Sequence, residues 1–157
     1  MSVTAAELVE QIRDDYDGEL TEAEARSEVD AWVGVARQDV QQIMQHLKEA
    51  HAPAHLSTIT GMDVGDAIAI IYHYAVEGCQ LNVRCLVPKE DNRIDSITPV
   101  APAAILYERE ISDLLGVEFV GHPDPRRLIL PDEWPEGDYP LRREEAADDG
   151  ESDEESA

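Results

Sequence analysis

The chain has 157 residues, of which 43% are hydrophobic, and a formal net charge of -23 at pH 7. This length predicts one domain with one hydrophobic core rather than two independent cores. The negative charge argues against binding to nucleic acid or directly to an anionic membrane surface, because both are held by lysine and arginine. Such an excess of acid over lysine also resembles the surfaces of proteins from salt-rich cytoplasm, which says nothing about activity.

The cysteines and the distribution of apolar residues indicate the cellular compartment of the protein. Cys79 and Cys85 lie in one predicted strand, roughly 20 Å apart at the usual rise, so they cannot bridge each other. The sequence has no CxxC motif and no Cys/His cluster, so we expect no zinc or iron–sulfur centre in this chain and a reducing, cytosolic compartment. We see no signal peptide and no run of about 18 apolar residues, so we expect membrane contact only through a partner.

The first 50 residues of the sequence predict a helix, a linker, a strand and a second helix. Residues 3–16 have apolar residues at helical spacing, and Thr4 with Glu7 forms a capping-box pattern. Residues 17–28 are charged and are interpreted as a linker. Residues 29–36 alternate apolar and polar positions as a half-buried strand does. Residues 38–50 again have helical spacing.

Three strand-like segments follow, at residues 55–61, 67–76 and 79–87. Glu77 and Gly78 separate the last two, which suits a hairpin. The pattern predicts an α+β fold in which a small antiparallel or mixed sheet packs with helices.

The C-terminal part begins with a proline-rich stretch, residues 88–102, for which we expect an extended connection and no regular element. A helix is predicted over residues 103–115, ended by Gly116, and it retains an apolar side beyond the one that packs on the sheet. We expect a short strand at 117–119, a turn at 121–124, and an extended segment after Leu130.

The predicted domain covers residues 1–143, with the sheet and a helix in 28–87, and with a helix, a turn and an extended arm in 103–143. Residues 144–157 are an acidic tail without large apolar residues, and we expect this tail to be disordered.

The stretch 107–130 combines acids, arginines and a histidine with apolar residues, so it is interpreted as an interface or a site, because charge near a buried surface needs partners. Arg109 and Asp113, four residues apart, could form an intrahelical ion pair. His122, before Pro123, is typical of a turn. The sequence has no GxSxG, P-loop or GxGxxG motif, and we identify no catalytic, cofactor-binding or metal-binding residues.

Arginine and aromatic residues gather near the C-terminus. Arg126, Arg127, Arg142 and Arg143 are close in sequence to Trp134 and Tyr139. In so acidic a chain, this cluster favours a partner surface that carries carboxylates, which guanidinium groups bind bidentately.

These residues resemble a known signature. The order is Glu108-Arg109-Glu110, Asp113-Leu114-Leu115, then His122 and Arg126-Arg127-Leu128-Ile129. It is similar to the signature of the 30 kDa family of respiratory complex I, whose members are its C-type subunits, and the similarity extends over about residues 55–143. The form LPDEWPEGDYPLR is similar to members found in membrane-bound [NiFe] hydrogenases. Two departures are the Ile105-Leu106 pair, where complex I members commonly have Asn-Trp, and the acids that follow Arg143.

The resemblance implies a subunit without cofactor or active site of its own, in a complex whose iron–sulfur clusters, and in hydrogenases a nickel–iron site, lie in partner subunits. The implied partners are a hydrogenase-like large subunit (D type) and a small iron–sulfur subunit (B type). The implied location is peripheral, on the cytoplasmic side of the cell membrane. Electron donor, acceptor and coupling ion stay open. The expected signature and interface residues are Glu108, Arg109, Glu110, Asp113, His122, Asp124, Arg126, Arg127, Trp134 and Arg142.

Two alternatives belong to other classes of protein. One is a stand-alone acidic enzyme that uses His122 with Asp113 or Asp124. The other is a soluble adaptor unrelated to redox complexes.

Overall fold

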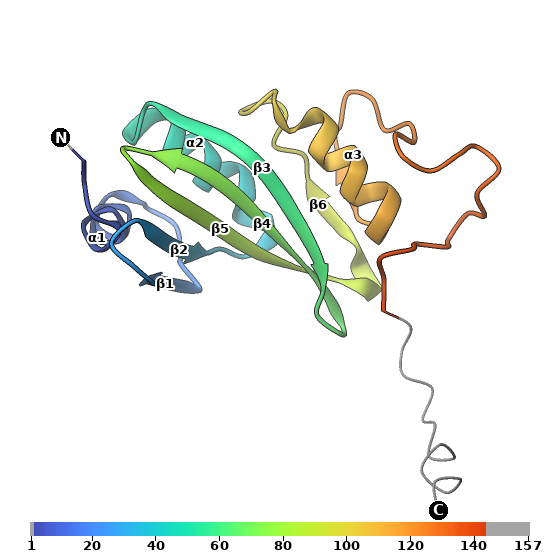
Figure 1. Cartoon of the computed structure of the whole chain (residues 1–157), viewed down its shortest axis with the longest axis horizontal. Helices are drawn as coiled ribbons and strands as arrows, with labels where there is room; N and C mark the ends of the chain where they lie inside the picture. Colours follow the sequence, from blue (N-terminus) through green and yellow to red (C-terminus); the bar gives the residue numbers. More distant parts are fainter. Residues whose placement is uncertain (1, 144–157) are drawn as a thin grey trace, which may run out of the picture.

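The structure is a computed structural model that describes residues 2–143, and the predicted acidic tail lies outside the described residues. Figure 1 shows a sheet with helices behind it and at one end. The elements are, in chain order, α1 (Ala5–Asp15), β1 (Glu22–Ala25), β2 (Asp30–Gly34), a 3-10 turn (Arg37–Asp39), α2 (Val40–Ala50), β3 (Ala54–Asp63), β4 (Ala67–Val76), β5 (Cys79–Pro88), a 3-10 turn (Lys89–Asp91), β6 (Arg93–Asp95), α3 (Ala104–Leu115) and β7 (Glu118–Val120).

The main sheet has five strands in the order β1-β2-β5-β4-β3. All neighbours are antiparallel except β2 and β5, which are parallel, so the predicted α+β fold with a mixed sheet is confirmed. The predicted β4–β5 hairpin is also confirmed. Its two turn residues, Glu77 and Gly78, have φ of 50° and 89°, the positive values that a type I′ turn requires.

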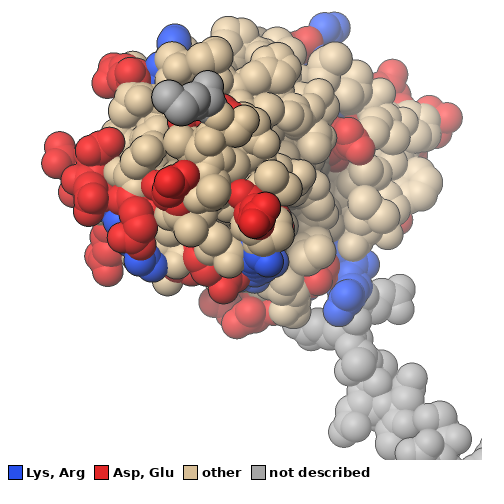
Figure 2. Space-filling model, turned by 60° about the vertical axis from the view of Figure 1, so that its left-hand side comes forward, with Lys and Arg blue, Asp and Glu red and all other residues tan. Residues whose placement is uncertain are grey.

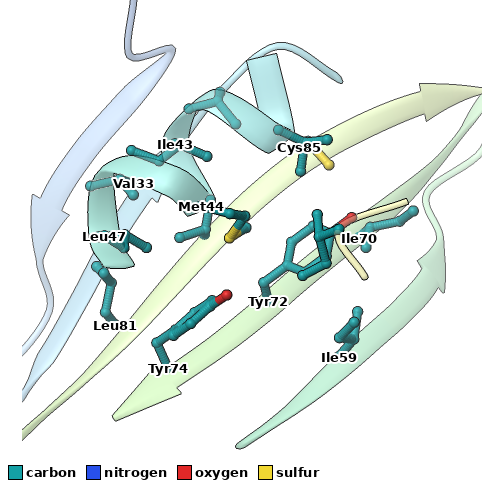
Figure 3. Close-up of a cluster of buried hydrophobic side chains, with 14 of the residues drawn as sticks. Val33, Ile43, Met44, Leu47, Ile59, Ile70, Tyr72, Tyr74, Leu81 and Cys85 are labelled. Atoms are coloured by element: carbon teal, nitrogen blue, oxygen red, sulfur yellow. The ribbon is translucent and has the colours of Figure 1, made fainter. Parts of the chain in front are cut away.

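The core lies between the sheet and helices α1, α2 and α3. In Figure 3, Ile43, Met44 and Leu47 of α2 lie over side chains from β4 and β5, among them Tyr72 and Leu81. All five of these side chains are at most 1% exposed. The alternation along β5 places every second residue on this face.

The other face of the sheet carries a polar network. His73 Nδ1 donates to Asn82 Oδ1 (2.6 Å), and the other ring nitrogen, Nε2, lies 2.8 Å from Thr60 Oγ1. Asn82 Nδ2 donates in turn to Asp30 Oδ1 (2.7 Å). Further along this face Leu86 is 47% exposed. An antiparallel pair of strands commonly has one such solvated face.

Helix α1 begins as the sequence predicts. The Thr4 side chain accepts the Glu7 backbone N–H, and the Glu7 carboxylate accepts the Thr4 backbone N–H at 2.8 Å. The first amphipathic helix and its capping box are therefore confirmed.

Two predicted connections contain strands instead. Residues 17–28, interpreted as a linker, include β1, which pairs with β2. Residues 88–102, for which no regular element was predicted, include β6, which pairs in parallel with β7. Both strands are very short, and β6 has a single buried residue, Ile94. They form because neighbouring strands supply hydrogen-bond partners, which a hydrophobic period cannot reveal.

Edge strand β3 meets helix α3. The pairing of β3 with β4 shifts its register between Leu56 and Thr58, at a β-bulge. The Tyr107 hydroxyl of α3 donates to the Ser57 carbonyl at this bulge (2.9 Å). Close approach of the helix depends on Gly61, since a Cβ there would stand 2.6 Å from a Leu115 methyl group.

Among the charged side chains of the surface, acids outnumber bases. Figure 2 shows them in large groups, with basic side chains scattered among them. Within residues 2–143, no helix has the length and apolar character that crossing a bilayer requires.

Candidate interaction site on helix α3 and the C-terminal arm

Helix α3 ends at Gly116, which has φ of 74° and closes the helix in the left-handed conformation, as predicted. After β7 the chain turns and then follows an irregular course, which Figure 1 shows in orange and red beyond α3. We call residues 125–143 the C-terminal arm. The predicted signature residues lie on α3, in the turn and in this arm.

Glu108 of α3 is fully buried. Its carboxyl group accepts hydrogen bonds from Ser96 Oγ (2.6 Å) and from the backbone N–H of Ile97 (2.8 Å). Burial raises the pKa of Glu108, because a low-dielectric environment disfavours the charged form. Glu108 therefore ties α3 to the segment after β6 and is not available to a partner.

Arg109 holds the start of the C-terminal arm. Its Nε donates to the carbonyl of Arg126 (2.9 Å) and its Nη2 to that of Arg127 (3.0 Å). Nη1 lies 3.5 Å from Asp124 Oδ2. The predicted intrahelical ion pair with Asp113 is therefore not formed, because the arm offers both side chains better-placed partners.

Asp113 binds three consecutive amides of the arm. Its Oδ2 accepts the backbone N–H groups of Leu128 (2.8 Å), Ile129 (2.8 Å) and Leu130 (3.2 Å). The residue is only 8% exposed. Successive N–H groups around an anion form a nest, here with a carboxylate of the same chain as the anion.

His122 occupies the predicted turn. Its Nδ1 accepts the Asp124 backbone N–H (2.9 Å), and Nε2 lies 2.9 Å from the Ile105 carbonyl. These partners assign the neutral tautomer that carries its proton on Nε2. Within the described residues, the ring makes no hydrogen bond to the carboxylate of Asp113 or Asp124, so neither pair proposed for a stand-alone enzyme is assembled.

Asp124 lies between two guanidinium groups. Its oxygens accept from Nε (2.7 Å) and Nη2 (2.9 Å) of Arg126, and Arg109 lies on the other side. The bonds from Arg126 hold the pKa of Asp124 well below its usual range. The Arg126 side chain stays 80% exposed despite this pairing.

Two further arginines stabilise the arm from within. Arg127 Nη1 donates to the carbonyls of Pro131 (2.8 Å) and Trp134 (2.8 Å). Arg142 Nε donates to the Leu115 carbonyl (2.7 Å). The predicted cluster of four partner-facing arginines is therefore divided, because Arg127 and Arg142 bind carbonyl groups of their own chain.

Trp134 also closes the arm on itself, since its indole N–H donates to the Asp138 carbonyl (2.8 Å). Tyr139 packs against Gly116, where an added Cβ would meet the ring at 2.4 Å. The far end of the arm is tied down by the Arg143 backbone N–H, which donates to Asp63 Oδ2 (2.6 Å).

The outward surface of α3 and the arm is formed by different residues. Glu110 and Arg126 are its exposed signature charges. Its exposed apolar side chains are Leu106 (52%), Leu128 (42%), Ile129 (49%) and Leu141 (56%). None of these four is among the expected interface residues, although the sequence predicts a further apolar side on α3, and the apolar run Leu128-Ile129-Leu130 directly after two arginines carries a signal of exposure in a proline-rich segment.

A cavity of about 440 Å³ lies between α3, β7 and the arm, lined among others by Arg109, Ser112, His122 and Tyr139. Within residues 2–143, no three His, Cys, Asp or Glu side chains converge as a metal site would require. The arrangement is suited to presenting a fixed surface to another protein.

Comparison with known proteins identifies the family. Residues 33–151 match the model of the respiratory-chain NADH dehydrogenase 30 kDa subunit. The chain belongs to this family. The resemblance drawn from the signature residues is thereby confirmed.

Two relatives of this chain belong to different complexes. It is 33% identical over 119 residues to the beta subunit of the membrane-bound hydrogenase of Pyrococcus furiosus, covering 73% of this chain and 69% of that one. It is 33% identical over 120 residues to the C-type subunit of the NADH-quinone oxidoreductase of Chloroherpeton thalassium, covering 74% of this chain. The chain spans only 47% of that second relative.

A solved structure shares the fold. A chain of the membrane-bound sulfane sulfur reductase, an archaeal respiratory membrane complex, superposes with a TM-score of 0.78 at 26% identity. The match covers 87% of this chain and 82% of that one.

Proposed function

We propose that this chain is a non-catalytic subunit in the peripheral arm of a membrane-bound oxidoreductase of the complex I and membrane-bound hydrogenase superfamily. It docks through α3 and the C-terminal arm on the hydrogenase-like large subunit of D type. In doing so it supports electron transfer to quinone or to protons, coupled to ion translocation.

The observation that carries this proposal is the construction of the arm. Arg109, Asp113, Arg127 and Arg142 satisfy backbone groups of the arm or of the end of α3. An irregular segment normally depends on water for these bonds. Here it keeps a fixed shape without a helix or strand, and a fixed shape lowers the entropy cost of association.

The complex would supply the redox groups. Iron–sulfur clusters, and in a hydrogenase the nickel–iron site, belong to partner subunits under this proposal, including the small iron–sulfur subunit of B type. The chain would lie on the cytoplasmic side of the membrane and touch the membrane only through the complex. The relatives named above, one from a hydrogenase and one from a quinone oxidoreductase, support this class of assembly.

The test compares two exposed arginines. Arg126→Ala removes the exposed signature cation, and Arg93→Ala removes a similar one, whose side chain is 68% exposed and paired with Glu118. We expect Arg126→Ala to reduce recovery of the large subunit when the tagged chain is purified from its own membranes in high salt. Arg93→Ala should leave recovery unchanged.

Thermal unfolding of each isolated chain checks that the domain is intact, and we expect both variants to melt as the wild type does. Full recovery of the large subunit with Arg126→Ala in high salt would contradict the assigned interface. Purification of the wild-type chain without any redox subunit would contradict the proposed function itself.

A further inference from the structure

The arm directs apolar side chains outward at the point where its backbone is held most tightly. Leu128 and Ile129 are 42% and 49% exposed, although their own N–H groups bind the buried Asp113 carboxylate. Hydrogen-bonding two successive amides to an inner group fixes the conformation of this segment. The two side chains are therefore presented in one position instead of being free to fold back on the core.

Helix α3 carries an exposed apolar side chain as well. Leu106, 52% exposed, stands one helical turn before Arg109 and Glu110 on α3. Arg109 donates hydrogen bonds to the carbonyls of Arg126 and Arg127. Arg109 therefore joins the helix to the start of the arm, and each of the two carries exposed apolar side chains, Leu106 on α3 and Leu128 with Ile129 on the arm.

An exposed cation, Arg126, precedes Leu128 and Ile129 in the arm. Arg126 directs its Nε and Nη2 to Asp124, which fixes the guanidinium while the side chain stays 80% exposed. The chain as a whole has a formal charge of -23. A second copy of this chain would therefore meet strong repulsion, whereas a different protein with carboxylates opposite Arg126 would be complementary.

We propose that Leu128 and Ile129 are the apolar anchors of the docking surface, that they enter a groove of the large partner subunit, and that Arg126 faces a carboxylate beside that groove. This inference rests on the proposed function and deepens it, because it names the side chains that make the contact. Anchors held rigidly by their own chain lose little freedom on binding, which is typical of residues that dominate the energy of an interface.

A second apolar pair provides a matched control. Met62 and Leu86 are 48% and 47% exposed. They lie on either side of Ala69, on the two strands that flank β4, and on the face of the sheet that none of the described helices covers. They have the same degree of exposure and the same chemistry as the anchors. Their backbones are also fixed, by the pairing of β3 and β5 with β4, so the control differs from the anchors in its place on the molecule and not in rigidity.

The experiment uses the full chain in its own membranes, tagged and expressed at its normal level. One variant carries Leu128→Asp with Ile129→Asp, and the control carries Met62→Asp with Leu86→Asp. After detergent extraction, the partners that co-purify are quantified by mass spectrometry, and each isolated chain is melted to confirm folding. We expect the first variant to recover at least tenfold less large subunit, since loss of an anchor commonly weakens binding by tenfold or more.

The outcomes separate the inference from the proposed function. If the 128/129 variant retains the large subunit, or if only the 62/86 control loses it, the anchor assignment is overturned while the docking function stands. If the wild type recovers only further copies of itself, or no redox subunit, both are overturned. A 128/129 variant that no longer melts cooperatively is replaced by Leu128→Ser with Ile129→Ser, and undiminished recovery with that variant overturns the assignment equally.

Discussion

Asp113 connects helix α3 to the C-terminal arm through a single carboxylate oxygen. Replacing it with alanine removes the acceptor of three amides, at 2.8, 2.8 and 3.2 Å. Because Leu128 and Ile129 are themselves about half exposed, water can reach their amides once the arm opens. We therefore expect the arm to detach locally while the sheet and its core stay folded.

The size of the effect follows from the bonds. A hydrogen bond to a charged group contributes about 1.5–3 kcal/mol, and hydration of the freed amides recovers part of this. Three bonds of unequal length, shared by one oxygen, then stabilise the closed arm by about 3 kcal/mol, roughly a 100-fold change in its opening equilibrium. Asp113→Asn keeps a neutral carbonyl acceptor and should cost about 1 kcal/mol, roughly fivefold.

Native-state hydrogen exchange measures this opening. The useful reporter is an arm amide that Asp113 does not bind, namely Leu141 N–H, which donates to the Leu114 carbonyl of α3. It should exchange about 100-fold faster in Asp113→Ala, and Glu110→Ala, an exposed acid on the same helix, should leave it unchanged. Unaltered protection of Leu141 in Asp113→Ala would refute the view that this carboxylate holds the arm.

Three other predictions concern stability. Gly61→Ala places a Cβ 2.6 Å from a Leu115 methyl group and should lower the free energy of unfolding by about 1–3 kcal/mol in a denaturant titration. Burial and the nearby His46 lower the pKa of His51, so the protein should lose stability as pH falls from 8 to 6, through the unfolded value of 6.5. His51→Phe should flatten the dependence of Tm on pH in that range. An unchanged slope would contradict this role of His51. The bond from Lys89 lowers the pKa of Asp63 to about 2, so the Asp63 carboxylate stabilises the fold above the unfolded value of 3.8 and loses this effect as pH falls toward 2. Asp63→Asn should therefore be less stable than the wild type at pH 7 and equal to it near pH 2.

Long periodic segments could be predicted from the sequence. Helix α1 with its capping box, helix α2 and strands β3 to β5 follow from spacing of apolar residues alone. Strands β1 and β6 could not be predicted, because each is too short for a period and forms only where a neighbouring strand offers hydrogen-bond partners. The parallel pairing of β2 with β5 is likewise a property of the whole sheet.

The candidate site was predicted in its members but not in their roles. The sequence identified Arg109, Asp113, Arg127 and Arg142 as charges in need of partners. It left open which of them hold the turn and the arm and which face a partner, and the structure shows these four bound to backbone groups of the C-terminal arm and of the end of α3. The turn at His122 brings the C-terminal arm back against α3, and contacts of this kind depend on the tertiary structure and not on a local pattern.

The bulge in β3, with its Ser57 carbonyl bound by the Tyr107 hydroxyl, protects this edge of the sheet. An outer strand with regular, unpaired amides is a template onto which another polypeptide can add and begin aggregation. Here the irregular register and the hydroxyl from α3 interrupt that template near the start of the strand. Together with the mutual repulsion of so acidic a surface, this disfavours the addition of a second copy of the chain at β3.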